Sequence, residues 1–256
     1  MDGLVCDLDG VVYRGDQPIA GAAEAIDRMR TAGLRLVFCT NNSRLTVDEY
    51  VEKLAGLGVK ASPPEVLTSG VVTAEVLAER GATGAHAIVV GGQGLRAALT
   101  DVGIVIDDDP SAGSADLVVV GWDQAFNFDA MRRAALAVRS GAAFVATNKD
   151  ASFPAPGGEL WPGAGAILAS IEVASGRTAE VMGKPHAPMM DAAAGRLGGC
   201  EHIAIVGDRP ETDLVGGAAR GWTTILVLSG VTGRGEVETL DPPADLVIES
   251  LADLAR

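Results

Sequence analysis

Near the start of the chain stands the stretch Val5-Cys6-Asp7-Leu8-Asp9-Gly10-Val11-Val12. An apolar segment ends there in two carboxylates that stand two residues apart and are followed by glycine. In open α/β sheets, ligands bind just beyond the carboxyl ends of the strands, where Asp7 and Asp9 are expected to lie. Two close carboxylates repel unless a cation or a proton separates them, so the segment favours a Mg²⁺ ion with one nucleophilic and one proton-transferring carboxylate. An Asx turn at the strand end is the alternative.

Short apolar segments alternate with longer amphipathic ones along the chain. The apolar segments carry β-branched residues with little alternation, as in strands buried on both faces of a parallel sheet. The expected strands are Leu4–Leu8, Leu34–Thr40, Ala87–Val90, Asp116–Val120, Ala143–Thr147, Ile203–Val206, Thr224–Leu228 and Ala244–Ile248. The expected helices, each followed by a glycine that favours a helix end, are Gly21–Ala32, Thr46–Leu57, Gly70–Arg80, Gly94–Val102, Asp129–Ser140, Gly163–Ser175, Pro188–Leu197 and Glu211–Arg220.

This order of segments predicts an α/β fold with a doubly wound, Rossmann-like parallel sheet. The middle third of the chain, Ala87–Ala169, has a strand–helix pattern of its own. A second α/β unit is therefore expected to be inserted into the first rather than to follow it.

Composition excludes several classes of partner. The 256 residues include 20 Lys and Arg and 34 Asp and Glu, which gives a net charge of −14 and argues against nucleic acid or an anionic membrane surface. No apolar run reaches the roughly 18 residues of a membrane span, and Met1–Asp9 has no basic region, so a cytoplasmic protein is expected. Cys6, Cys39 and Cys200 form no CxxC pair, which argues against a disulfide framework or a zinc site.

A second buried segment, Leu36–Arg44, ends in small polar side chains. Thr40 and Asn41 offer neutral donors for phosphate oxygens, while Ser43 or Thr46 could cap the next helix. A capping loop without further function is the alternative.

Lys184 stands between glycine and proline, which places it on a turn. From there it could bring a positive charge to Asp7 and Asp9. The alternative is an ordinary surface lysine.

A third apolar segment, Ile203–Val206, runs into Gly207-Asp208, and Asp213 follows five residues later. Asp208 has the hard oxygen atoms that Mg²⁺ prefers. Asp213 could orient Lys184 or a metal-bound water. The alternative is a helix N-terminus at which acids complement the dipole.

Together, in the order DxDG, TNN, GKP and GDxxxTD, these motifs resemble those of the haloacid dehalogenase (HAD) superfamily, and the resemblance covers essentially the whole chain. The further segments Ala146–Asp150, Phe153-Pro154 and Pro162–Gly165 resemble subfamily IIA. This branch carries a large α/β cap and includes 4-nitrophenylphosphatase-like, phosphoglycolate, glycerol-phosphate and pyridoxal-phosphate phosphatases. The resemblance implies a HAD core domain of residues 1–81 and 179–256 with an inserted α/β cap domain of residues 82–178.

The resemblance also implies a reaction. Asp7 would attack phosphorus and form an aspartyl-phosphate, and Asp9 would protonate the leaving alcohol and then activate water. Mg²⁺ would be held by Asp7, Asp208 and the main-chain carbonyl of Asp9.

The same resemblance assigns the remaining site residues. Thr40, Asn41 and Lys184 would hold the phosphate oxygens, Thr40 and Lys184 as part of the catalytic machinery. Asn42 and Arg44 would contact the substrate or the cap. The expected activity is a Mg²⁺-dependent phosphatase acting on a small phosphorylated metabolite, and by analogy the enzyme is expected to form a homodimer.

Other activities stay open at this point. A phosphotransferase or phosphomutase could use the same fold, as could a non-catalytic module that binds phosphorylated metabolites. Asp9 argues against a dehalogenase, because dehalogenases of the superfamily lack the second aspartate.

Several residues of the expected cap could face the substrate or could serve its folding only. These are Asn148, Asp150, Phe153 and Trp161. The turn Val89–Gly94 could mimic a nucleotide-binding loop, but it lacks the GxGxxG spacing.

Overall fold

The computed structural model describes residues 1–107, 114–154 and 159–254, without the side chains of residues 153 and 154. The chain divides into two compact units. The core unit comprises Met1–Thr40, Asp48–Leu67 and Lys184–Arg256, and the inserted unit comprises Asn41–Val47 and Thr68–Gly183. The inserted unit is thus wider than the cap of residues 82–178 that the sequence suggests. That assignment of core and cap domains stays a prediction.

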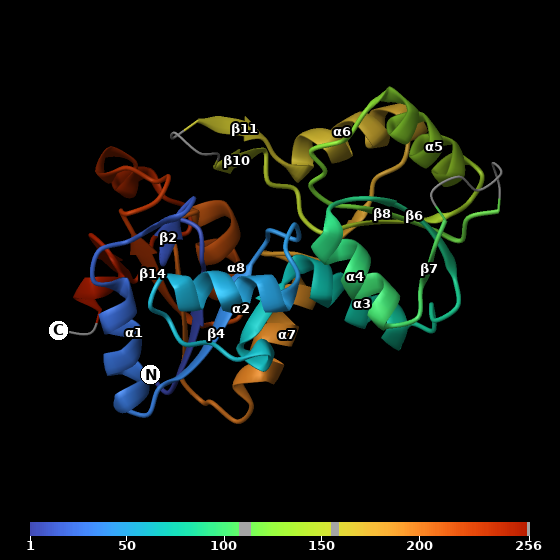
Figure 1. Ribbon diagram of the computed structural model, residues 1–256. Helices are drawn as coiled ribbons and strands as arrows, with labels where there is room; N and C mark the ends of the chain where they lie inside the picture. Colours follow the sequence, from blue (N-terminus) through green and yellow to red (C-terminus); the bar gives the residue numbers. More distant parts are fainter. Residues whose placement is uncertain (108–113, 155–158, 255–256) are drawn as a thin grey trace. The chain divides into compact units, whose positions relative to one another are not determined.

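The core unit is built on a six-stranded sheet whose central strands pair in parallel (Figure 1). Its order is β15 (Leu246–Ile248), β14 (Thr223–Val227), β13 (Ile203–Gly207), β1 (Gly3–Cys6), β4 (Arg35–Thr40) and β5 (Val66–Thr68). Carboxyl ends of parallel strands meet at one edge of a sheet. Asp7 follows β1, Thr40 ends β4 and Asp208 follows β13, so these three residues stand at the same edge.

The helices in the described part of the core unit are α1 (Ala22–Thr31), α2 (Val47–Gly56, all but its first residue), α7 (Ala187–Leu197) and α8 (Val215–Ala218). Helix α7 packs on β1 and β4, and α8 packs on β14. Shorter elements complete it: β2 (Tyr13–Arg14), β3 (Gln17–Pro18), the 3₁₀ turns η1 (Pro63–Glu65), η4 (Arg234–Thr239) and η5 (Leu251–Asp253), and the π turn η3 (Pro210–Leu214).

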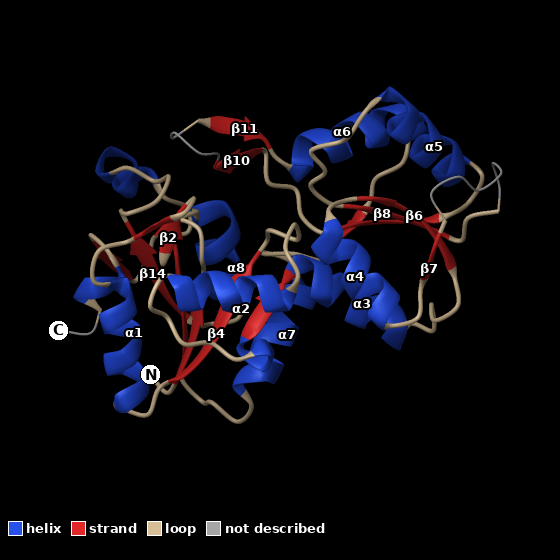
Figure 2. Cartoon of the chain, in the orientation of Figure 1, coloured by secondary structure: helices blue, strands red, loops and turns tan. Residues whose placement is uncertain are grey.

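The inserted unit has a five-stranded parallel sheet between two pairs of helices (Figure 2). The sheet order is β12 (Glu180–Val181), β9 (Ala143–Ala146), β8 (Leu117–Val120), β6 (His86–Val90) and β7 (Val105–Ile106). The paired helices are α3 (Ser69–Glu79) with α4 (Gln93–Asp101), and α5 (Phe128–Arg139) with α6 (Ala164–Ser175). Strands β10 (Ser152–Pro154) and β11 (Leu160–Pro162) form a separate antiparallel hairpin.

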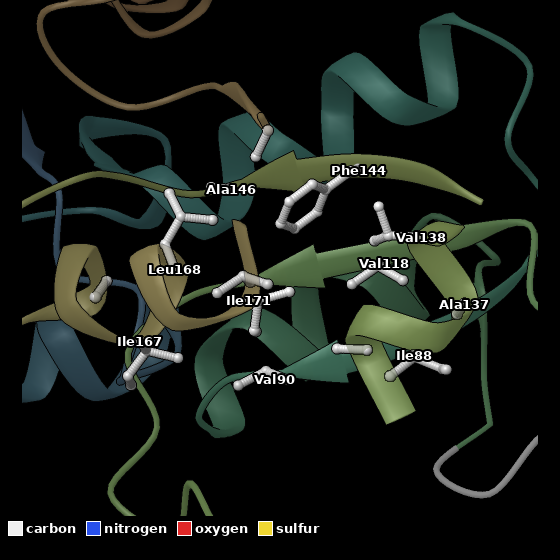
Figure 3. Close-up of a cluster of buried hydrophobic side chains, with 14 of the residues drawn as sticks. Ile88, Val90, Val118, Ala137, Val138, Phe144, Ala146, Ile167, Leu168 and Ile171 are labelled. Carbon is white, nitrogen blue, oxygen red and sulfur yellow. The ribbon is translucent and has the colours of Figure 1, made fainter. Parts of the chain in front are cut away.

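Alternate residues of each central strand enter different hydrophobic clusters. Val118 and Val120 of β8 pack with α5 and α6 in the cluster of Figure 3. Leu117 and Val119 belong to the opposite cluster, with α3 and α4. Because both faces are covered by helices, every position of the strand is apolar, which explains the continuous hydrophobic runs in the sequence.

The α/β class and the parallel sheet predicted from the sequence are confirmed, and each of the eight expected strands has a counterpart. The prediction of one continuous α-helix over Glu211–Arg220 is wrong. A π turn at Pro210–Leu214 replaces its first half, and only Val215–Ala218 is α-helical. The wide turn brings Asp213 back against the end of β13.

Among the described residues, no helix combines the length and apolar character that crossing a bilayer requires.

Helix α6 has one face buried in the core of the inserted unit and another face exposed. Ile171 is 0% exposed within the cluster of Figure 3, whereas Val173 on the same helix is 85% exposed. We expect Ile171→Ala to lower the free energy of unfolding by about 2–5 kcal/mol and Val173→Ala to change it by less than about 0.5 kcal/mol. Urea unfolding of both variants measures the difference; equal effects would contradict the packing described for α6.

Candidate active site

Lys184 is the centre of a buried cluster of charges in the core unit. It is 3% exposed. Its Nζ donates to Asp7 Oδ1 at 2.7 Å, to Asp213 Oδ1 at 2.7 Å and to the main-chain oxygen of Cys39 at 3.0 Å. These contacts use the three donors of an ammonium group. The structure thus brings together three residues that the sequence singled out, and Lys184 is not a surface lysine.

Burial and the neighbouring charges of opposite sign have opposing effects on the pKa values of Lys184 and Asp7. Burial disfavours the charge of Lys184, but Asp213 and Asp7 offset that effect and hold the pKa of Lys184 well above its ordinary value. Burial raises the pKa of Asp7, and the neighbouring carboxylates of Asp213 and Asp208 raise it further, while Lys184 opposes them. The ammonium is therefore what allows several carboxylates to be buried side by side.

Asp213 holds Lys184 and is itself held on both oxygens. Its Oδ2 accepts a hydrogen bond from the main-chain N–H of Arg209 at 3.2 Å and one from Thr212 Oγ1 at 3.4 Å. A side chain on Gly207 would place Cβ 2.1 Å from Asp213 Cγ, so this close approach requires glycine. Asp213 therefore fixes the position of the lysine from the π turn.

Asp208 is buried at the end of β13 with one oxygen bound and one oxygen unpaired. Oδ2 accepts a hydrogen bond from the Val231 N–H at 2.7 Å, whereas Oδ1 has no hydrogen-bond partner among the described residues. Gly10 packs against this carboxylate with φ +84°, and a Cβ there would lie 2.3 Å from Asp208 Oδ2. Burial, with Asp213 acting in the same direction, raises the pKa of Asp208 to about 6.

The carboxylates fit a hard divalent cation. One oxygen from each of Asp7, Asp208 and Asp213 lies within 4.8 Å of the others. Three ionised carboxylates and one ammonium would leave a net charge of −2, which is costly in a buried site unless a cation compensates it. Because Asp213 uses both its oxygens in hydrogen bonds, Asp7 and the unpaired Asp208 Oδ1 are the better donors. The expected contribution of the Asp9 main-chain oxygen stays a prediction.

Asp9 stands beside two residues that the sequence analysis did not single out. Burial raises its pKa, while Lys53 and a hydrogen bond from the Tyr13 hydroxyl act in the opposite direction. The pKa of Tyr13 is raised well above its ordinary value by burial and by Asp9. Tyr13 could have been suspected from its place four residues after Asp9, but nothing in the sequence points to Lys53.

Thr40 and Asn41 fall on opposite sides of a boundary between the units. Thr40 ends β4 and is buried in the core unit. Asn41 lies in the inserted unit, where its Nδ2 donates to Asp150 Oδ1 at 3.0 Å and its main-chain oxygen accepts from Asn148 Nδ2 at 2.7 Å. Ser69 Oγ donates to the same oxygen at 2.5 Å. Asn148 and Asp150 therefore hold Asn41 in place.

Asn42 and Arg44 also lie in the inserted unit. Asn42 Oδ1 accepts from the Arg44 N–H at 3.0 Å, and the main-chain oxygen of Arg44 accepts from the Gly94 N–H at 2.9 Å. Gly94, in the first turn of α4, thus binds the chain's own backbone. Trp161 Nε1 donates to Glu159, and the side chain of Phe153 lies outside the described residues.

Comparison with known proteins gives the family. Residues 4–105 match the family model for haloacid dehalogenase-like hydrolases, and residues 181–254 match a model described as HAD-hydrolase-like. An acid sugar phosphatase of Staphylococcus aureus is 38% identical over 238 residues, which cover 93% of this chain and 90% of that protein. The chain belongs to the haloacid dehalogenase-like hydrolases. The family and the hydrolase class predicted from the sequence are thereby confirmed.

Solved structures of this hydrolase family have the same fold. A p-nitrophenyl phosphatase from Archaeoglobus fulgidus matches with a TM-score of 0.91 and 31% identity, over 99% of this chain and 98% of that one. A glycerol phosphate phosphatase from Mycobacterium tuberculosis, solved in complex with magnesium, matches with a TM-score of 0.89 and 34% identity, over 99% of this chain and 76% of that one. The resemblance to 4-nitrophenylphosphatase-like and glycerol-phosphate phosphatases is therefore confirmed.

We expect the buried carboxylates of this hydrolase to make its stability depend on pH and on a bound divalent cation such as Mg²⁺. Asp208 has a folded pKa of about 6 against an ordinary value of 3.8, so the folded protein binds the proton more tightly than the unfolded chain. Without metal, the Asp208 contribution to stability falls as the pH rises through that interval. Mg²⁺ requires the ionised carboxylate, so it should stabilise the protein more at about pH 7.5 than at about pH 4.5.

Thermal unfolding with and without MgCl₂ at both pH values measures this effect. At a hundredfold excess over its Kd, Mg²⁺ should stabilise the folded state by about 2.7 kcal/mol. Asp208→Asn should remove the gain, and Asp27→Asn, an exposed control, should keep it. An equal gain in Asp208→Asn would contradict the cation site.

Proposed function

We propose that this hydrolase is a Mg²⁺-dependent phosphatase that cleaves phosphate monoesters of small metabolites through an aspartyl-phosphate on Asp7. The observation that carries the proposal is the buried Lys184, which binds Asp7 and Asp213 beside an Asp208 oxygen that has no hydrogen-bond partner in the described part of the chain. A carboxylate held next to a cation is suited to nucleophilic attack on phosphorus. The relatives named above are phosphatases, which supports the same reaction.

In the first step, a carboxylate oxygen of Asp7 forms a bond to phosphorus while the bond between phosphorus and the leaving oxygen breaks. Asp9 gives its proton to that oxygen, and the alcohol leaves. The contact between Lys184 and Asp7 Oδ1 fixes the orientation of the attacking carboxylate.

In the second step, a water oxygen forms a bond to phosphorus and the bond to Asp7 breaks. Asp9, now ionised, takes the proton from the water. The products are the alcohol and inorganic phosphate, and both aspartates return to their starting states. Asp9 thus alternates between acid and base, and its raised pKa favours the protonated form that the first step needs.

The remaining residues of the site bind the phosphate group, the metal ion or each other. Lys184 reduces the repulsion between the phosphate and the carboxylates, and Asp213 keeps Lys184 in place. Asp7 and Asp208 would hold Mg²⁺, with the Asp9 main-chain oxygen; the bound ion would neutralise charge on the phosphate. Thr40 and Asn41 would donate hydrogen bonds to phosphate oxygens.

Sugar and polyol phosphates are the first substrates to examine, since the relatives include an acid sugar phosphatase and a glycerol phosphate phosphatase. Asn42 and Arg44 would contact the substrate or the cap. The homodimer and the cytoplasmic location expected from the sequence stay predictions.

Release of phosphate from a panel of phosphorylated metabolites and 4-nitrophenyl phosphate tests the proposal. We expect turnover with Mg²⁺ and none with chelator. Asp7→Asn should lower kcat by at least about 10³-fold because the nucleophile is lost, and Asp9→Asn should lower it by about 10²–10⁴-fold. Asp27→Asn, which changes an exposed acid in the same way, should keep the activity.

Full activity in Asp7→Asn would rule out Asp7 as the nucleophile. A folded protein that binds Mg²⁺ but releases no phosphate from any monoester would instead favour a phosphomutase or a non-catalytic binding module. Transfer of phosphate between positions of one sugar phosphate would identify the mutase.

A further inference from the structure

The loop Ser229–Thr232, which follows β14, binds Asp208 on both its side chain and its backbone. The Val231 N–H donates to Asp208 Oδ2 at 2.7 Å, and Thr232 Oγ1 donates to the main-chain oxygen of Asp208 at 2.6 Å. Gly230 lies so close that a Cβ there would stand 2.0 Å from Asp208 Oδ2. The position of this loop therefore decides how the Asp208 carboxylate is held.

Two side chains tie this loop to the segment that follows Asp9. Ser229 Oγ donates to the main-chain oxygen of Gly10 at 2.7 Å. Arg14 on β2, which lies beside β14 in Figure 1, donates from Nε to the main-chain oxygen of Ser229 and from Nη2 to that of Gly230 at 3.0 Å. A guanidinium group presents its donors in a rigid fork, so it can hold two successive carbonyl groups at once.

The two segments joined in this way both contact the carboxylate. A Cβ on Gly10 would lie 2.3 Å from Asp208 Oδ2 and 2.9 Å from Gly230 Cα. The hydrogen bonds of Arg14 and Ser229 thus connect the two pieces of backbone that pack against Asp208. All of these residues belong to the core unit.

The arrangement leaves Asp208 with one oxygen for a cation. Oδ2 is engaged by the Val231 N–H, and Oδ1 has no hydrogen-bond partner among the described residues. A carboxylate held on one oxygen cannot turn both oxygens toward an ion. Mg²⁺ requires a near-ideal octahedron of about six ligands, whereas Ca²⁺ accepts about six to eight oxygens and often takes both from one carboxylate. Single-oxygen ligation therefore suits the smaller ion.

We propose that Arg14 and Ser229 are positioning residues that make the cation site favour Mg²⁺ over Ca²⁺. They hold the Ser229–Thr232 loop in the place where the Val231 N–H retains Asp208 Oδ2, so that Oδ1 alone faces the ion. The inference rests on the cation site of the proposed function and concerns binding of the ion rather than turnover.

Calorimetric titration of the metal-free full chain with MgCl₂ and, separately, with CaCl₂ tests this role. We expect Ser229→Ala and Arg14→Met each to raise the Kd for Mg²⁺ by about 10-fold, within the range of about 10–100-fold for contacts that orient a metal ligand. The Kd for Ca²⁺ should change by less than about 3-fold, because a carboxylate that is free to turn offers the larger ion both oxygens. The preference for Mg²⁺ should fall accordingly.

Two further variants serve as controls. Ser229→Thr keeps the hydroxyl group and should keep the preference for Mg²⁺. Arg35→Met is matched to Arg14→Met, because Arg35 is also an exposed arginine of the core unit that donates to a distant main-chain oxygen, that of Gly198. It should leave both Kd values unchanged.

Equal changes in the two Kd values, or no change in either, would overturn the proposal. So would a lower melting temperature of the metal-free variants together with an unchanged preference for Mg²⁺, since that is the result of a purely structural role. Failure of the unsubstituted protein to bind either ion would refute the inference as well. A protein that shows the expected loss of preference but cleaves no phosphate monoester would support the inference and refute the proposed function.

Discussion

The buried Lys184 binds Asp7 and Asp213 at the edge of the core sheet and compensates their negative charges. Lys184 also donates to the main-chain oxygen of Cys39. The most distant of these partners in the sequence, Asp7 and Asp213, are 206 residues apart. Removing one member of such a buried ion pair leaves an uncompensated charge, which typically costs about 3–5 kcal/mol. The ends of β1, β4 and β13 are therefore held together by electrostatics as well as by main-chain pairing.

The same cluster of charged side chains requires glycine at two neighbouring backbone positions. The carboxylate of Asp208 leaves no room for a side chain at Gly10, and that of Asp213 leaves none at Gly207. The π turn at Pro210–Leu214 is a wider coil than an α-helix, and it presents Asp213 to the lysine. Wide helical turns of this kind often occur at functional sites, where they aim a side chain that a regular helix would direct elsewhere.

Most strands of the two large sheets could be predicted from the sequence, because they are buried on both faces and appear in the sequence as apolar runs. Strands of two or three residues, such as β7 and β12, are too short for any periodic signal. The order of motifs also led to Asp7, Lys184, Asp208 and Asp213, which the structure brings together. The pairing of Tyr13 with Lys53 joins segments with no sequence relation, so only the folded chain reveals it.

The segment Asn41–Val47 has a consequence for the modularity of the molecule. It belongs to the inserted unit although residues 48–67, which follow it, belong to the core unit. Its carbonyl groups satisfy donors of Asn148, Ser69 and Gly94 within the inserted unit. The inserted unit is thus made of two separate pieces of chain. Grafting residues 68–183 onto another scaffold as one cassette would leave these donors without acceptors, so an exchange between relatives has to carry residues 41–47 as well.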